Sequence, residues 1–279
     1  MIDRNEILNL LLSAINSSVR AGALIMEVYN SDDFQVNLKS DKTPLTLADR
    51  LAHDSIKSDL LKTFIPVLSE EGRSITYEER KGWEYFWIVD PLDGTKEFIK
   101  RNGEFTVNVA LIHDGFPILG VIYVPVNRDL YFSFQQGGAY RTGGIAPCLE
   151  ANFDLDELLD TATKLPMPCE RDHLVVVESR SHATPETLEY IEGLKRQHGS
   201  LELISRGSSL KMCMIAEGNA DIYPRLSLSS EWDTAAGQAI VEGSGFQVVT
   251  YETNERMVYN KEELLNPWFI VKGNRLVKG

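Results

Sequence analysis

The sequence predicts an α/β fold in which layers of helices pack against β-sheets. Three patterns indicate this class: a long amphipathic helix near the N-terminus, a central run of alternating apolar strands, and strands alternating with helices toward the C-terminus. The 279 residues suit one large domain or two closely packed halves. Hydrophobic residues make up 43% and charged residues 25%, which is ordinary for a globular protein with a sizeable core.

The first elements are two helices and a short strand. Residues 4–29 carry apolar side chains at helical spacing, and the polar residues 30–33 end that helix. A second helix is expected from residue 47 to about residue 64, with Thr46 as its N-cap and Asp49 as a capping acid. A short strand over residues 66–69 then leads into Glu70 and Glu71.

Residues 87–95 are the stretch in which we expect the chemistry. An apolar, aromatic run predicts a buried strand that ends at Asp90, and a proline, Asp93, Gly94 and Thr95 follow it closely. Pro fixes its own φ and Gly permits unusual angles, so a tight turn would hold two acids and a hydroxyl together. Adjacent buried carboxylates are costly unless a cation lies between them. The alternatives are a hard-metal site and an ordinary surface turn.

The middle of the chain predicts an antiparallel meander. After a loop or short helical turn at 96–104, apolar strands are expected at 106–111, 118–124 and 130–134. The Pro-containing, acidic segment 143–172 shows no clear period. We therefore divide the chain into an α+β half, residues 1–145, with the metal motif and an α/β half, residues 146–279, with a substrate-binding helix. In the second half, strands are expected at 174–177, 203–205, 221–223, 246–249 and 269–271, and helices at 185–198, 208–217 and 233–243.

Net charge and cysteine content limit the classes of partner and compartment. A net charge of −13 argues against nucleic acid as a partner, and an anionic substrate would need a bound cation. Cys148, Cys169 and Cys213 form no CxxC pair, which favours a reducing compartment and buried, unpaired thiols. Acids occupy the N-terminus where a signal peptide would be basic, and no run approaches membrane-spanning length. A soluble, cytoplasmic protein is therefore expected.

Four carboxylates lie where predicted elements begin or end: Glu70, Asp90, Asp93 and Asp233. An all-oxygen ligand set selects Mg²⁺, Mn²⁺ or Ca²⁺ rather than Zn²⁺. Carboxylates shared between ions roughly 3.5–4 Å apart are the usual machinery for transferring a phosphoryl group to water. Asp233 could instead be a helix N-cap.

A phosphate site is a second possibility along the chain. Residues 207–211, which include Ser208 and Lys211, open a predicted helix, and free N–H groups, hydroxyls and a lysine bind phosphate readily there. Arg225 follows a predicted strand. A simple serine cap is the alternative interpretation.

Together these motifs resemble the inositol monophosphatase superfamily of Mg²⁺-dependent, Li⁺-sensitive phosphatases. The resemblance rests on the Asp-Pro-Leu-Asp-Gly-Thr sequence of residues 90–95, the upstream Glu-Glu pair and the downstream Trp-Asp pair. It is closest to the branch of CysQ-type 3'(2'),5'-bisphosphate nucleotidases, and it runs from roughly residue 5 to 270. The stretches that carry it are 90–108, 180–182, 207–211, 216–218, 223–225 and 232–237. The segment 148–172 departs from the pattern.

The resemblance implies an αβαβα sandwich of the sugar-phosphatase type and a role for each site residue. Glu70, Asp90, Asp93, Asp233 and the carbonyl of Leu92 would bind two or three Mg²⁺ ions, with Mn²⁺ as a substitute. Thr95, hydrogen-bonded to Asp49, would help Glu70 deprotonate the attacking water, and the N–H groups of Gly94 and Thr95 would face the phosphate.

The implied substrate is adenosine 3',5'-bisphosphate, converted to AMP and phosphate, which would remove a by-product of sulfate activation. His182, Ser208, Lys211 and Arg225 would hold the adenosine and its 5'-phosphate, while Glu70, Leu92, Asp93, Gly94, Thr95 and Asp233 would contact the scissile phosphate. No obligatory protein partner is implied. A peripheral position on the inner face of the inner membrane is compatible, but no basic amphipathic helix requires it.

The sequence has three alternative functional interpretations. A haloacid-dehalogenase-type phosphatase also uses an Asp-Gly-Thr turn, but it needs two acids two residues apart, whereas Asp90 and Asp93 are three apart. An inositol or sugar phosphatase of the same superfamily is less favoured by residues 96–98 and 207–211. A non-catalytic metal or nucleotide sensor lacks the spacing of a calcium hand.

Overall fold

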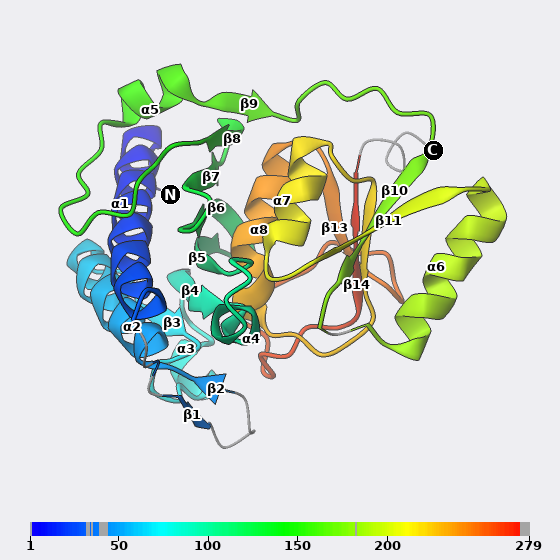
Figure 1. Cartoon of the computed structure of the whole chain (residues 1–279). Coiled ribbons are helices and arrows are strands. Elements are labelled where there is room, and N and C mark those ends of the chain that lie inside the picture. The colour runs from blue at the N-terminus through cyan, green and yellow to red at the C-terminus, as the bar shows by residue number, and fades with distance from the viewer. Residues whose placement is uncertain (1, 32–33, 35, 39–43, 182, 274–279) are drawn as a thin grey trace.

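The computed structural model describes residues 2–31, 34, 36–38, 44–181 and 183–273. It confirms the αβαβα arrangement (Figure 1). Helices α1 (Arg4–Tyr29) and α2 (Leu47–Leu60) cover one face of the first sheet. Helices α7 (Leu210–Glu217) and α8 (Glu231–Gly243) lie between the two sheets, and α6 (Pro185–His198) covers the outer face of the second.

The first sheet has seven strands in sequence order, and only its first pair is parallel. The predicted meander is confirmed, and two further strands extend it at one edge. The strands are β3 (Val67–Ser69), β4 (Tyr85–Asp93), β5 (Thr106–His113), β6 (Phe116–Val124), β7 (Asp129–Phe134), β8 (Gly138–Thr142) and β9 (Thr163–Leu165).

The second sheet has five strands in the order β11-β10-β12-β14-β13. Strand β10 is parallel to both of its neighbours, and the other pairs are antiparallel. Its strands are β10 (Leu174–Ser179), β11 (Leu201–Arg206), β12 (Ile222–Arg225), β13 (Gln247–Thr250) and β14 (Phe269–Lys272). Each strand and helix predicted for the second half is present within a few residues of its expected bounds.

Short elements complete the chain, and two of them lie in the segment predicted to have no regular structure. These two are α5 (Leu155–Thr161) and β9, which pairs with β8, so residues beyond 145 complete the first sheet. The division at residues 145 and 146 stays a prediction. The other short elements are β1 (Asn37–Leu38), β2 (Pro44–Leu45), the 3₁₀ helix η1 (Leu61–Thr63), α3 (Tyr77–Arg80) and α4 (Thr95–Ile99).

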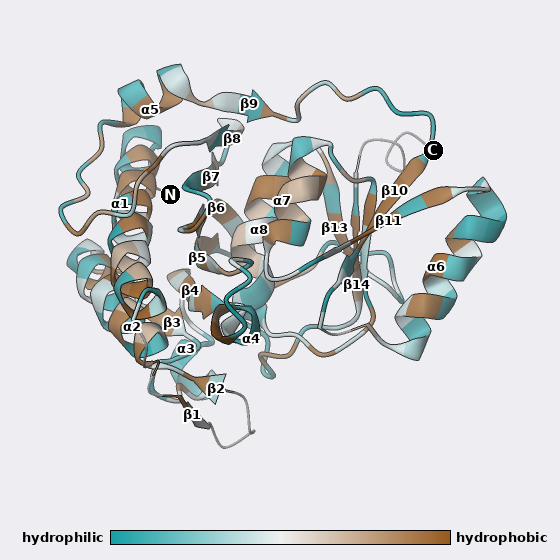
Figure 2. Ribbon diagram, in the orientation of Figure 1, coloured by the Kyte–Doolittle hydropathy of each residue, from teal (hydrophilic) through white to brown (hydrophobic). Residues whose placement is uncertain are grey.

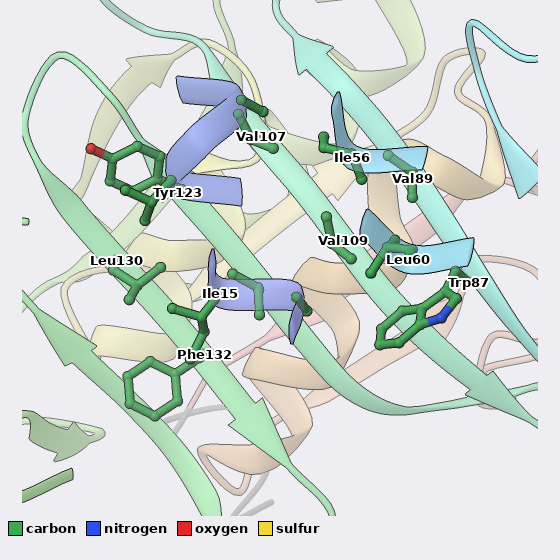
Figure 3. Close-up of a cluster of buried hydrophobic side chains, with 14 of the residues drawn as sticks. Ile15, Ile56, Leu60, Trp87, Val89, Val107, Val109, Tyr123, Leu130 and Phe132 are labelled. Atoms are coloured by element: carbon green, nitrogen blue, oxygen red, sulfur yellow. The ribbon is translucent and has the colours of Figure 1, made fainter. Parts of the chain in front are cut away.

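The largest core lies between α1, α2 and the first sheet. Figure 3 shows Ile15 of α1, Ile56 of α2 and Trp87 of β4 converging there, and all three are fully buried. Figure 2 shows the matching pattern, with hydrophobic residues concentrated on the strands and on the helices between the sheets. Burial at about 25 cal/mol per Å² of apolar surface makes this packing the main force holding the layers together.

Two expectations are corrected: that no run of residues approaches membrane-spanning length, and that all three cysteines are buried. By length and composition α1 could cross a membrane, contrary to the expectation that no run approaches that length. It is apolar because it packs on the sheet along one side and on α2 along another: 67% of its most apolar window is buried. Cys213 is buried as expected, but Cys148 and Cys169 are exposed: Cys148 lies in the connection between β8 and β9, and Cys169 in the connection between β9 and β10.

Candidate active site

The end of β4 has an irregular backbone that gathers the site's first residues. Its ladder with β5 pairs Asp90 with Asn108 and then shifts register before Asp93 pairs with Thr106. The carboxylate of Asp90 accepts a hydrogen bond from the backbone N–H of Leu92 at 3.1 Å, which stabilises the bend. Gly94 follows with φ of 93°, and a Cβ there would lie 3.0 Å from the carbonyl oxygen of Glu104. Glycine is therefore required both by its conformation and by the close approach of that backbone.

A pocket of about 520 Å³ lies at this strand end and is lined by residues from both halves of the chain. It brings together ten of the twelve residues predicted for the site: Glu70, Asp90, Leu92, Asp93, Gly94, Thr95, Ser208, Lys211, Arg225 and Asp233. Asp49 lies behind the wall in contact with Thr95. His182 lies outside the described residues. Of the adjacent glutamates only Glu70 lines the pocket, in agreement with the family pattern.

The acidic wall of the pocket holds several carboxyl groups at close range. Burial raises the pKa of Asp90 well above its usual value, and the charges of Glu70, Asp93 and Asp233 raise it further. Burial likewise raises the pKa of Asp233 to about 7, with Asp93 and Glu70 as the next causes. Asp90 is also in hydrogen-bond contact with Glu70. Carboxyl groups this close are stable only when a proton or a cation lies among them.

The donor set fits a hard divalent cation. Oδ2 of Asp93 accepts hydrogen bonds from Ser208 and Ser209, each at 2.8 Å, and Oδ2 of Asp233 accepts one from the N–H of Ser230. Within the described chain, no hydrogen bond reaches the second oxygen of either carboxylate, so that oxygen can bind an ion. The described residues contain no ready-made group of three His, Cys, Asp or Glu ligands. Carbonyl, water or substrate oxygens would complete the coordination, as is usual for Mg²⁺.

Thr95 and Asp49 form a hydrogen-bonded pair beside the acidic wall. The Thr95 hydroxyl donates to Oδ1 of Asp49 at 3.2 Å, with the carbonyl of Leu92 at 3.4 Å as a weaker acceptor. Oδ2 of Asp49 accepts the backbone N–H of Thr46 at 2.7 Å and so caps α2. The capping role and the Thr95 contact, which the sequence left as alternatives, therefore coexist on the two oxygens of one carboxylate.

Two basic side chains also line the pocket. Lys211 is buried, and burial lowers its pKa to about 8. Its ammonium donates to the carbonyl of Ser208 at 2.5 Å. The guanidinium of Arg225 donates to the hydroxyl of Ser179 at 3.1 Å and to the carbonyl of Leu228 at 2.7 Å. Two buried cations in a pocket that is also lined by carboxylates suit a ligand that carries more than one phosphate.

Two capping interpretations from the sequence are wrong. The hydroxyls of Ser208 and Ser209 do not cap α7, because both point at Asp93 instead. Asp233 is not the N-cap of α8. The N-cap is Ser230, and Asp233 occupies the third helical position, where its carboxylate accepts the Ser230 N–H at 2.9 Å.

Sequence reasoning missed Glu104, which ties the two halves together at the pocket. Its carboxylate accepts two hydrogen bonds from Arg180, each at 2.8 Å, and one from the backbone N–H of Gly207 at 2.8 Å. Gly207 packs so closely that a Cβ would lie 2.8 Å from Cγ of Glu97. The only sequence signal for Glu104 was its place within the motif of residues 90–108, because its partners lie 76 and 103 residues away.

Comparison with known proteins places the chain in a family. The model of the inositol monophosphatase family matches residues 8–274. The chain is 42% identical over 254 residues to the 3'(2'),5'-bisphosphate nucleotidase CysQ of Escherichia coli strain K12, covering 90% of this chain and 94% of that protein. It is 30% identical over 279 residues to the same-named protein of Haemophilus influenzae, covering 99% and 96%.

Solved structures agree with this placement. The crystal structure of CysQ from Bacteroides thetaiotaomicron, a bacterial member of the same family, superposes with a TM-score of 0.90 at 48% identity over 97% of this chain and 99% of that one. The extragenic suppressor protein suhB of Bartonella henselae shares the fold, with a TM-score of 0.72 at 24% identity over 97% and 96%. The chain therefore belongs to the inositol monophosphatase family.

Proposed function

We propose that this protein hydrolyses the 3'-phosphate of adenosine 3',5'-bisphosphate to give AMP and inorganic phosphate, in a Mg²⁺-dependent reaction. The observation that carries the proposal is the pocket itself, which is lined by carboxylates from β4, from the loop after β3 and from α8 together with Lys211 and Arg225. The similarity to nucleotidases of the CysQ type supports this substrate over other phosphate monoesters. We further propose that the enzyme acts in the cytoplasm without an obligatory protein partner.

Glu70, Asp90, Asp93, Asp233 and the carbonyl of Leu92 would hold two or three Mg²⁺ ions, and Mn²⁺ could replace them. When bound, such ions lower the pKa of water from ~15.7 toward ~7 and neutralise phosphate charge. The protein's own part is to fix these oxygens on rigid strand and helix ends, with Asp90 buried and Asp233 half-buried. The burial keeps competing bulk water away from the reacting phosphate.

Thr95, Asp49 and Glu70 would handle the proton of the attacking water. Because the Thr95 hydroxyl donates its proton to Asp49, its oxygen is left as an acceptor for a water proton. Thr95 would orient the water through that hydrogen bond, and Glu70 would accept the transferred proton as general base. The N–H groups of Gly94 and Thr95, at the start of α4, would donate to the equatorial phosphate oxygens.

Lys211, Arg225 and Ser208 would hold the second, 5'-phosphate on the cationic side of the pocket, and His182 stays a predicted contact to the adenosine. An inositol monophosphate has one phosphate and would leave these cations without an anionic partner. The buried positive charges of Lys211 and Arg225 are therefore the feature that favours a bisphosphate over a monophosphate substrate.

Phosphate release from adenosine 3',5'-bisphosphate should be compared with release from inositol 1-phosphate, each with Mg²⁺ and with chelator. We expect the bisphosphate to be preferred by at least about 100-fold in kcat/KM, because an unmatched buried charge pair costs roughly 3 kcal/mol or more. A preference for inositol 1-phosphate would assign a different substrate. Absence of turnover on both, with binding of Mg²⁺ intact, would favour a sensor.

Mg²⁺ affinity should depend on pH in a defined direction. A raised pKa means that Asp233 binds a proton in the metal-free protein below about pH 7, so an ion must displace that proton. Lowering the pH from 8 to 6 should weaken Mg²⁺ binding, by up to about tenfold per pH unit for each proton displaced. Calorimetry at both pH values, in buffers of different ionisation enthalpy, measures affinity and proton release together. Equal affinity at both pH values, without proton release, would contradict this coupling.

A further inference from the structure

We propose that Asn108 and Ser209 are positioning residues that orient the carboxylate of Asp93 toward the divalent cation. The inference rests on the proposed function only in taking Asp93 as a metal ligand. It does not depend on the identity of the phosphate ester. Both residues lie in stretches that carry the resemblance, but the resemblance gives neither a role, and neither would touch the substrate or the reacting atoms. Both would act through Asp93.

The contacts run in a short, buried chain from one half of the protein to the other. The side-chain amide of Asn108, on β5, donates to the hydroxyl of Ser209 at 2.8 Å. The Ser209 hydroxyl, at the start of α7, donates to Oδ2 of Asp93 at 2.8 Å. The same amide also lies 3.4 Å from Oδ2 of Asp93 and so supports it weakly. Asn108 and Ser209 are 1% and 3% exposed, so water does not compete for these hydrogen bonds.

Among the neighbouring hydroxyl groups, Ser209 is the one that consistently donates its proton to Asp93. The Thr106 hydroxyl lies 2.8 Å from Oδ1 of Asn108 and 2.6 Å from the hydroxyl of Ser208, but it has one proton to donate. Ser208 likewise can donate either to Thr106 or to Asp93. Ser209 is different: the amide N–H of Asn108 can only donate to the Ser209 oxygen, so the Ser209 proton stays available for Asp93. Its one other acceptor, the carbonyl of Asp233, is farther away at 3.2 Å.

These hydrogen bonds orient the carboxylate of Asp93 in the proposed metal site. Because Ser209 and Asn108 bind Oδ2 of Asp93, the carboxylate plane is fixed and Oδ1 is directed away from them. Gly94 and Gly207 let both of their segments pack closely against the backbone at Glu104. A Cβ on either glycine would lie within 3.0 Å of the Glu104 carbonyl oxygen. The contact of the N-terminal end of α7 with the end of β4 and the start of β5 therefore sets the orientation of one predicted ligand. Groups that orient a metal ligand typically contribute 10–100-fold to metal affinity.

The test is Mg²⁺ binding by calorimetry without substrate, for the wild type and for Ser209→Ala. We expect the dissociation constant to rise roughly 10–100-fold in the variant. Most of the lost phosphate release should return at saturating Mg²⁺, because the chemistry uses other groups. Ser244→Ala is the matched control: that buried hydroxyl donates to the carbonyl of Ile240 at the far end of α8, so Mg²⁺ affinity should not change.

A double-mutant cycle separates positioning from a general loss of packing. Asn108→Ala should weaken Mg²⁺ binding, and adding Ser209→Ala should have little further effect, because Asn108 acts through Ser209. Independent, additive effects would overturn the proposed chain of contacts. Unchanged Mg²⁺ affinity in Ser209→Ala, with the thermal transition intact, would overturn the proposal entirely. Normal Mg²⁺ binding by a wild type that hydrolyses no bisphosphate would refute the proposed function and leave this inference standing.

Discussion

Asp93→Asn is expected to lower Mg²⁺-dependent release of phosphate from adenosine 3',5'-bisphosphate by at least about 100-fold while the protein still folds. Loss of a group that merely orients a ligand typically costs 10–100-fold, so loss of the ligand's charge should reach the upper end of that range or exceed it. The fold should survive because asparagine has the same shape and keeps one oxygen to accept from Ser208 and Ser209. A steady-state phosphate assay, together with circular dichroism, checks both parts.

The matched control for Asp93→Asn is Asp129→Asn. Asp129 forms an ion pair with Arg141 at 3.0 Å on β7 and β8, away from the residues that line the pocket. That variant should keep near-normal turnover and Mg²⁺ dependence. Full activity in Asp93→Asn would remove Asp93 from the ligand set, and with it the reason to place ions at the end of β4.

Thr95→Ala is expected to reduce kcat by about 10²–10⁴-fold and to change KM little, the range typical of a group that moves a proton in the transition state. The hydroxyl lies between Asp49 and the pocket, where it is placed to accept from water rather than to bind the nucleotide. Rapid-quench or steady-state kinetics at saturating Mg²⁺ separate the two constants.

Two further variants serve as controls for Thr95→Ala. Thr95→Ser keeps the hydroxyl and should retain most of the activity. Thr142→Ala removes a buried hydroxyl from β8, outside the pocket, and should leave kcat unchanged. If Thr95→Ala raised KM and left kcat intact, Thr95 would be a binding group and the proton would need another route.

The fold could be predicted from the sequence because most elements carry strong periodic patterns. The long helix was expected at residues 4–29 and spans Arg4–Tyr29, since its apolar stripe and polar end are unambiguous. The helix Pro185–His198 was also predicted to the residue, because Thr184 and Pro185 begin it and Gly199 ends it. Among the elements that were not predicted are α5 and β9, which are short and largely polar. Their structure depends on pairing with β8 and on packing against the first core.

The composition of the site was predictable, but its contacts were not. The carboxylates at strand and helix ends, and a possible phosphate site at Ser208, Lys211 and Arg225, could be found from local sequence patterns. The family resemblance then implied a role for each of them. The partners of Asp93 could not be found, because Ser208 and Ser209 lie 115 and 116 residues away. Their hydroxyls looked like ordinary helix caps. Only the folded structure, in which the N-terminal end of α7 meets the end of β4, shows that both hydroxyls contact a carboxylate instead.

The central claim is that acids from separate segments of the chain share divalent ions in one pocket. The most direct measurement is anomalous diffraction from crystals of the protein soaked in Mn²⁺, which locates the ions independently of any activity. The account predicts ions bound to carboxylate oxygens of Glu70, Asp90, Asp93 and Asp233 at ligand distance. Manganese peaks elsewhere on the surface, with the pocket empty at saturating Mn²⁺, would contradict it.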